Sequence, residues 1–155
     1  MIYIFTNRTE PKIFLYKQGE YSPGNFSERP ELFCLTLDGA ERMSTVNDYG
    51  DDVLETMQQG MPWVSTDAED AAKILRYCEI YDNLEYLSGR IEDIWSAVYT
   101  DACRGAATAD DWDRAAKTAY SINEKIDAAE KELDGIFPSP IVAFAAAFNY
   151  IFANK

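Results

Sequence analysis

The chain has 155 residues, of which 47% are hydrophobic and 14% aromatic; this is enough apolar side chain for one folded domain and excludes a disordered chain. It carries 27 acidic and 14 basic residues, for a net charge of −13, and no histidine. The negative charge disfavours direct binding of nucleic acid or anionic membranes, and the lack of histidine excludes Ser-His-Asp and Cys-His catalysis and removes the commonest zinc ligand.

The N-terminal segment turns polar after Phe5 and has neither a basic region nor a long apolar run, so it does not read as a signal peptide. No run of about 18 apolar residues predicts a transmembrane helix. The three cysteines, Cys34, Cys78 and Cys103, are odd in number and widely spaced, which predicts buried free thiols rather than a disulfide framework or a zinc site. We expect a cytoplasmic protein, or one of the host cytoplasm if it is phage-encoded.

The first 37 residues have the composition of strands. Short β-branched and aromatic runs at residues 1–5, 12–17 and 31–37 are separated by turn-rich segments, including a loop at 19–30 rich in Gly, Pro, Ser and Asn. They predict an antiparallel meander of about three strands. In the third run Phe33 and Leu35 lie on the more apolar face, which something must cover.

From residue 45 onward the hydrophobic period becomes helical. A short helix is expected at 51–59, ended by Gly60, and a second one with Thr66 as its N-cap and Glu69 completing a capping box. The second continues to about residue 103, as one helix or as two broken near Asp82-Asn83. A third begins at Thr108 and is expected to end before Gly135.

The last predicted helix has almost no polar residues. Ser139 suits the N-cap and Pro140 the first helical position, and the segment is too short to span a bilayer. Such a helix normally lies in the core, and a homodimer face is the less favoured alternative. The fold class is therefore α+β, with a small N-terminal antiparallel sheet followed by four to five helices. We expect one domain, 1–155, with a β-rich part at 1–37 and a helical part at 45–155.

The acidic residues suggest several kinds of site. Residues 46–60 hold Asp48, Asp51, Asp52 and Glu55 without a base, but their order does not match a calcium-binding EF-hand loop. Adjacent acids such as Asp51-Asp52 point about 100° apart on a helix and do not face each other, so shared acid–base chemistry has little support. We expect no metal, no cofactor and no catalytic residue.

A second acidic region lies in the helix that follows residue 66. Its acids recur every three residues with no base among them, and tyrosines are interleaved with them, whereas the helix at 109–134 pairs acids with bases four residues later. Solubility is the ordinary explanation of such a surface. The alternative is a set of carboxylates that competes for a phosphate-binding channel, with tyrosines as additional contacts. The predicted partner-binding residues are Asp48, Asp51, Asp52, Glu55, Glu79, Asp82, Glu85, Tyr77, Tyr81 and Tyr86.

The expected function is that of a small, acidic, non-enzymatic inhibitor. Its partner would be a basic protein that handles nucleic acid, such as a nuclease, as with the anti-CRISPR and anti-restriction proteins of phages and mobile elements. That expectation rests on size, charge and missing chemistry, and no motif connects the chain to a family. The alternatives are an immunity protein or antitoxin against a toxic nuclease, an enzyme that uses carboxylates alone, and a structural subunit that dimerises through the C-terminal helix.

Overall fold

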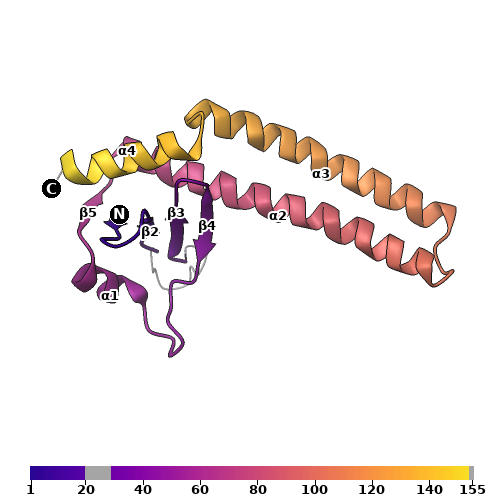
Figure 1. Cartoon of the computed structure of the whole chain (residues 1–155), viewed down its shortest axis with the longest axis horizontal. Helices are drawn as coiled ribbons and strands as arrows, with labels where there is room; N and C mark the ends of the chain where they lie inside the picture. The colour runs from indigo at the N-terminus through magenta and orange to yellow at the C-terminus, as the bar shows by residue number, and fades with distance from the viewer. Residues whose placement is uncertain (20–28, 154–155) are drawn as a thin grey trace. The chain divides into compact units, whose positions relative to one another are not determined.

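A computed structural model describes residues 1–19, 29–153 of the chain, and the central part of the predicted loop at 19–30 lies outside them. The described residues form an α+β protein with an antiparallel sheet and four helices, which confirms the predicted fold class (Figure 1). The elements in chain order are β1 (Ile2–Thr6), β2 (Ile13–Lys17), β3 (Glu31–Leu35), β4 (Ala40–Met43), α1 (Val53–Gly60), β5 (Trp63–Thr66), α2 (Glu69–Cys103), α3 (Ala109–Ile136) and α4 (Pro140–Ala153).

The chain divides into two compact units. Unit 1 comprises Met1–Asp82 and Ile136–Lys155, and unit 2 comprises Asn83–Gly135. Unit 1 combines the sheet with α1, the first part of α2, and α4. Unit 2 is a helical hairpin made from the rest of α2 and nearly all of α3. The α2 helix is continuous from Glu69 to Cys103, which settles the question of one helix or two.

The sheet has the strand order β4-β3-β2-β1-β5, with all neighbours antiparallel. The three predicted strands form its centre, and β4 and β5 add an edge strand on each side. On one face Ile4, Leu15 and Phe33 lie opposite one another across three strands, and all are fully buried. This face is covered by α4 and the first part of α2 (Figure 1).

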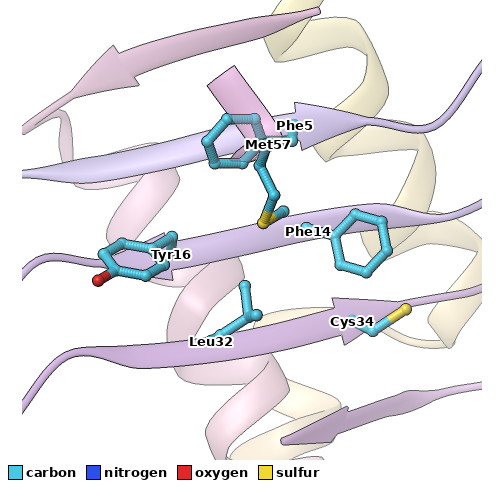
Figure 2. Packing of buried hydrophobic residues seen from close by; sticks show 6 residues of the cluster. All are labelled: Phe5, Phe14, Tyr16, Leu32, Cys34 and Met57. Carbon is cyan, nitrogen blue, oxygen red and sulfur yellow. The ribbon is translucent and has the colours of Figure 1, made fainter. Parts of the chain in front are cut away.

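The opposite face of the sheet is covered by α1. Figure 2 shows Met57 of α1 among Phe5, Phe14, Tyr16, Leu32 and Cys34 from the three central strands. Both faces of these strands are therefore buried, which is why the runs in the sequence are apolar almost without alternation. The helix α1 thus holds the acidic segment directly against the sheet.

Helix boundaries agree with the local signals at some positions and not at others. The Ser139 hydroxyl accepts from the Val142 N–H at 3.4 Å and α4 begins at Pro140, as predicted. Thr66, however, is the last residue of β5 and α2 starts only at Glu69, although the Thr66 hydroxyl accepts from the Ala68 N–H as an N-cap side chain would. Gly135 does not end the third helix, which continues through Ile136.

Unit 2 closes at a tight turn between its helices. Gly105 has φ +73°, a conformation that favours glycine, and its N–H donates to the Ala102 carbonyl. Thr108, where the third helix was expected to begin, forms a reciprocal cap with Asp111: the Thr108 N–H donates to the Asp111 carboxylate at 2.9 Å and the Asp111 N–H to the Thr108 hydroxyl at 3.3 Å. The Thr108 N–H lowers the pKa of the Asp111 carboxyl.

No single helix in the described part of the chain has both the length and the apolar character that crossing a bilayer requires. Only α3 and α4 taken together meet those two criteria. Of the three cysteines, Cys34 and Cys78 are buried as predicted, whereas Cys103 is exposed at the end of α2. Its position in the last turn of α2, next to the turn that closes unit 2, places it beyond the packed part of the helix.

Candidate functional site

The loop before α1 is closed by its own hydrogen bonds around Asn47. The Asn47 side-chain oxygen accepts from the N–H groups of Tyr49 and Asp51, both at 2.9 Å. The Asn47 N–H donates to the Asp51 carbonyl at 2.8 Å, and Gly50 completes the turn with φ +82°. An Asn side chain that binds the backbone two and four residues on fixes the loop without help from the core.

This closed loop projects two side chains into solvent. Tyr49 is 91% exposed and Asp48 is also exposed. An aromatic ring with so little burial contributes almost nothing to the core. Its position is nevertheless defined, because the backbone on both sides is held by Asn47.

Asp52 connects the loop to α1 and to the sheet. One of its carboxylate oxygens accepts from the Leu54 N–H at 2.8 Å, which caps α1, and the other accepts from the Tyr16 hydroxyl at 2.7 Å. Burial of the Tyr16 ring, together with this hydrogen bond, raises the pKa of the Tyr16 hydroxyl. Asp52 therefore anchors the acidic segment to the fold, and it is exposed like the acids beside it.

The remaining acids of this segment face solvent. We define the acidic loop–helix surface as Asp48, Tyr49, Asp51 and Glu55, all of them exposed. Asp51 and Glu55 also line an open depression of about 510 Å³ on α1, together with Asn47, Asp52, Leu54, Thr56 and Gln58. No lysine or arginine occurs anywhere in residues 43–72, which contain seven acids. No basic side chain of the same segment therefore neutralises these carboxylates, and they are suited to pairing with Lys or Arg side chains of a partner.

The predicted tyrosines at the start of α2 have internal roles. Tyr77 is 1% exposed and packs edge-on against Phe137 with ring centroids 5.6 Å apart. The Tyr81 hydroxyl donates to the Asp38 carbonyl at 3.0 Å, and its ring lies against Gly39, where an added Cβ would be 2.5 Å from the ring. Tyr77 is thus a core residue and offers no surface to a partner, whereas Tyr81 is half-buried and joins α2 to the β3–β4 turn.

The acids of the same part of α2 are also engaged within unit 1. Asp82 accepts from the Arg42 backbone N–H at 2.9 Å and lies 3.8 Å from the Arg42 Nε, so it joins α2 to β4. Glu79 pairs with Arg76 at 3.3 Å. Two of the three regularly spaced carboxylates therefore have basic partners. Asp82 pairs with an arginine forty positions away, and Glu79 pairs with one three positions away.

Glu85 and Tyr86 belong to unit 2 and are exposed, Tyr86 by 61%. The structure therefore does not gather the ten predicted residues into one site. It places Asp51 and Glu55 along one open depression on α1, with Asp48 and Tyr49 in the loop that precedes it.

Sequence reasoning missed Tyr49 and the exposure of two tryptophans. Tyr49 could have been found from the N-x-x-G spacing of Asn47 and Gly50, which is typical of a side-chain-closed turn. Trp95 lies in α2 and Trp112 in α3, both within unit 2. Their ring centroids lie 6.4 Å apart with the rings tilted, yet they remain 37% and 39% exposed near the closed end of the hairpin.

The described residues contain no group of three or more His, Cys, Asp or Glu side chains that could hold a metal ion. Comparison of the chain with protein-family models, with curated proteins and with solved structures finds no match. Any functional conclusion therefore rests on the residues of this chain.

Proposed function

We propose that this chain is a non-enzymatic binding protein that inhibits a basic, nucleic-acid-handling protein by occupying its nucleic-acid-binding surface. The observation that supports this proposal best is the acidic loop–helix surface, in which three exposed carboxylates and an exposed tyrosine lie in a segment without a single base. An inhibitor of this kind needs no catalytic group, only a surface that its partner binds in place of phosphates.

The chemistry of the partner follows from the charge. Proteins that bind nucleic acid carry Lys and Arg in positions that contact consecutive phosphates, and those side chains also bind carboxylates. With a net charge of −13 the chain would be drawn to such a cleft over long distances, and salt would weaken the attraction. Nucleic acid and this chain would then compete for the same basic residues.

Two features of the loop favour tight docking over loose attraction. The hydrogen bonds of Asn47 fix the loop before any partner arrives, so less conformational entropy is lost on binding. Tyr49 presents a large amphipathic ring at the tip of the loop, and tyrosine is among the residues that most often dominate binding energy. Asp48 and Asp51 flank that ring in the sequence and supply the charge.

The proposed site of action is the cytoplasm. Cys34, Cys78 and Cys103 are free thiols, and Cys103 is exposed, as is common in proteins kept in a reducing compartment. If a phage or mobile element encodes the chain, that compartment is the cytoplasm of its host.

The test uses charge reversal with a control of equal charge. Asp48, Asp51 and Glu55 are changed to Lys in one variant, and Glu124, Asp127 and Glu130, exposed acids of α3, are changed to Lys in the other. Both carry the same net charge, so a difference between them reports the place of the charge. Asp52 stays unchanged because it supports the fold.

Each variant is immobilised and used to capture proteins from the native host at low and at high salt. We expect a protein that wild type and the α3 variant capture at low salt, that the loop–helix variant does not, and that added DNA or RNA displaces. Equal capture by both charge-reversal variants would refute the assignment of the surface. Capture that nucleic acid does not reverse would refute the proposed mode of inhibition. Tyr49→Ala should lower affinity by at least about tenfold, or 1.4 kcal/mol, if the ring is a principal contact.

A further inference from the structure

Helix α4 has two apolar faces, and the protein buries only one of them. Ala143, Ala147 and Ile151 are fully buried in unit 1. On the opposite side Ile141 is 60%, Phe148 42% and Phe152 53% exposed, and Ala145 between them is exposed as well. We call Ile141, Ala145, Phe148 and Phe152 the outer stripe of α4. The expectation that this helix is buried all round is therefore wrong for half of its surface.

The outer stripe has the spacing of a helix–helix contact. Its members follow one another at steps of four, three and four residues, which is the alternation of a and d positions in a coiled coil. The Phe148 ring stacks against Phe144 with centroids 6.4 Å apart, and it lies tilted against Phe152 with centroids 4.6 Å apart. The aromatic side chains are thus already ordered by one another along the helix.

The stripe is complementary to itself when two copies run antiparallel. In that arrangement a positions face d positions of the partner helix, so Ile141 lies opposite Phe152 and Ala145 opposite Phe148. Both pairs are centred on the same point, between Ala146 and Ala147, so one twofold axis there satisfies both at once. The large Phe148 ring meets the small Ala145 of the other copy, and this size match fills the contact without a clash.

Charge points to the same surface. Pro140–Ala153 contains no charged residue, whereas α1, α2 and α3 all carry acids. Two copies of a chain with a net charge of −13 repel each other when acidic surfaces approach, and the outer stripe lets them meet without like charges in the contact. A helix that lies on a membrane usually presents Lys and Arg beside its apolar face, and α4 has neither.

We propose that the outer stripe of α4 is an isologous, antiparallel dimer contact between two copies of this chain. A single pair of helices about 21 Å long, at 1.5 Å per residue, gives a contact at the small end of specific interfaces. The dimer is therefore concentration-dependent. It leaves the acidic loop–helix surface of each copy outside the contact, because α1 covers the other face of the sheet from α4 (Figure 1).

Sedimentation velocity from about 10 μM to about 1 mM, a range that covers weak specific interfaces, tests the proposal. Wild type should pass from monomer to dimer, and Phe148→Lys should stay monomeric. Tyr120→Lys, at a 68% exposed ring on α3, adds the same charge elsewhere and should dimerise like wild type. A wild-type monomer at every concentration overturns the proposal, as does a Phe148→Lys variant that still dimerises.

A size swap tests the antiparallel register itself. Ala145→Phe places two large rings against each other and Phe148→Ala leaves two small side chains, so each single change should weaken the dimer. The double variant Ala145→Phe/Phe148→Ala restores one large and one small partner in each pair and should recover most of the association. Failure of the double variant to exceed both single variants overturns this register. Binding of wild type, and not Phe148→Lys, to phosphatidylcholine vesicles without any dimer would assign the stripe to lipid and overturn the dimer.

Discussion

Removal of the Asp52 carboxylate should destabilise the protein far more than removal of its neighbour Asp51. Asp52→Ala deletes the cap of α1, which typically contributes about 1 kcal/mol. It also leaves the buried Tyr16 hydroxyl without its acceptor, which costs about 1 kcal/mol more. We therefore expect a loss of about 2 kcal/mol in the free energy of unfolding. Asp51→Ala, which removes only a 3.5 Å contact with Asn47, should stay within about 0.5 kcal/mol of wild type.

A double-mutant cycle isolates the link between helix and sheet. Tyr16→Phe alone should cost about 1 kcal/mol, and Asp52→Ala in that background should cost only its capping contribution. The coupling between the two residues is then about 1 kcal/mol. Urea unfolding gives the loss in the free energy of unfolding for each variant from the shift in its midpoint, provided that the m value stays constant. A coupling near zero, or equal losses for Asp52→Ala and Asp51→Ala, would show that the carboxylate does not anchor α1.

Three further outcomes follow from the described contacts. The raised pKa of the Tyr16 hydroxyl, caused first by burial and then by the Asp52 hydrogen bond, favours the folded state below the unfolded pKa of about 10, and this contribution is lost as pH rises further. Stability should therefore fall less steeply above about pH 10 in Tyr16→Phe than in wild type, and equal slopes would contradict the assignment. In the native protein a thiol reagent should modify Cys103 alone, and unfolding should release the two buried cysteines; rapid labelling of all three under native conditions would contradict their burial. If the chain is one cooperative domain, as its length suggests, the urea transition of unit 1 should coincide with that of unit 2. Trp63 reports unit 1 in a variant with Trp95 and Trp112 changed to Phe, and this pair reports unit 2 in a Trp63→Phe variant; separated midpoints would show that the units unfold independently.

Local signals in the sequence predicted the elements whose ends are fixed by neighbouring residues. The helix starts at Thr108 and at Ser139-Pro140 depend on groups a few positions apart, so the sequence contains all that is needed. The edge strands were missed for the opposite reason. β4 is four residues long with three of them exposed, and β5 pairs with β1, some sixty positions earlier in the chain. Neither strand has an apolar pattern of its own.

The candidate site was predictable to a similar extent. Exposure of Asp48, Asp51 and Glu55 follows from a base-free acidic segment next to a short helix. The fate of the α2 residues could not be read in the same way, because it depends on which side of that helix meets the sheet. Asp82 reaches Arg42 across forty positions, and Tyr81 reaches the carbonyl of Asp38. Regular spacing of acids along a helix therefore did not distinguish a free surface from contacts that join two elements.

The cover of β1 by α4 has a consequence for synthesis on the ribosome. Ile4 is the third residue of β1, the first strand of the chain, yet the face of the sheet it belongs to is closed in part by residues 140–153. A nascent chain that has made all five strands and α2 still exposes the part of this aliphatic face that α4 covers, until α4 has emerged. Contacts between such distant segments slow folding, and exposed strands are prone to pair with other chains. A chaperone that binds extended apolar segments would act on this protein in the interval between synthesis of the fifth strand and emergence of α4.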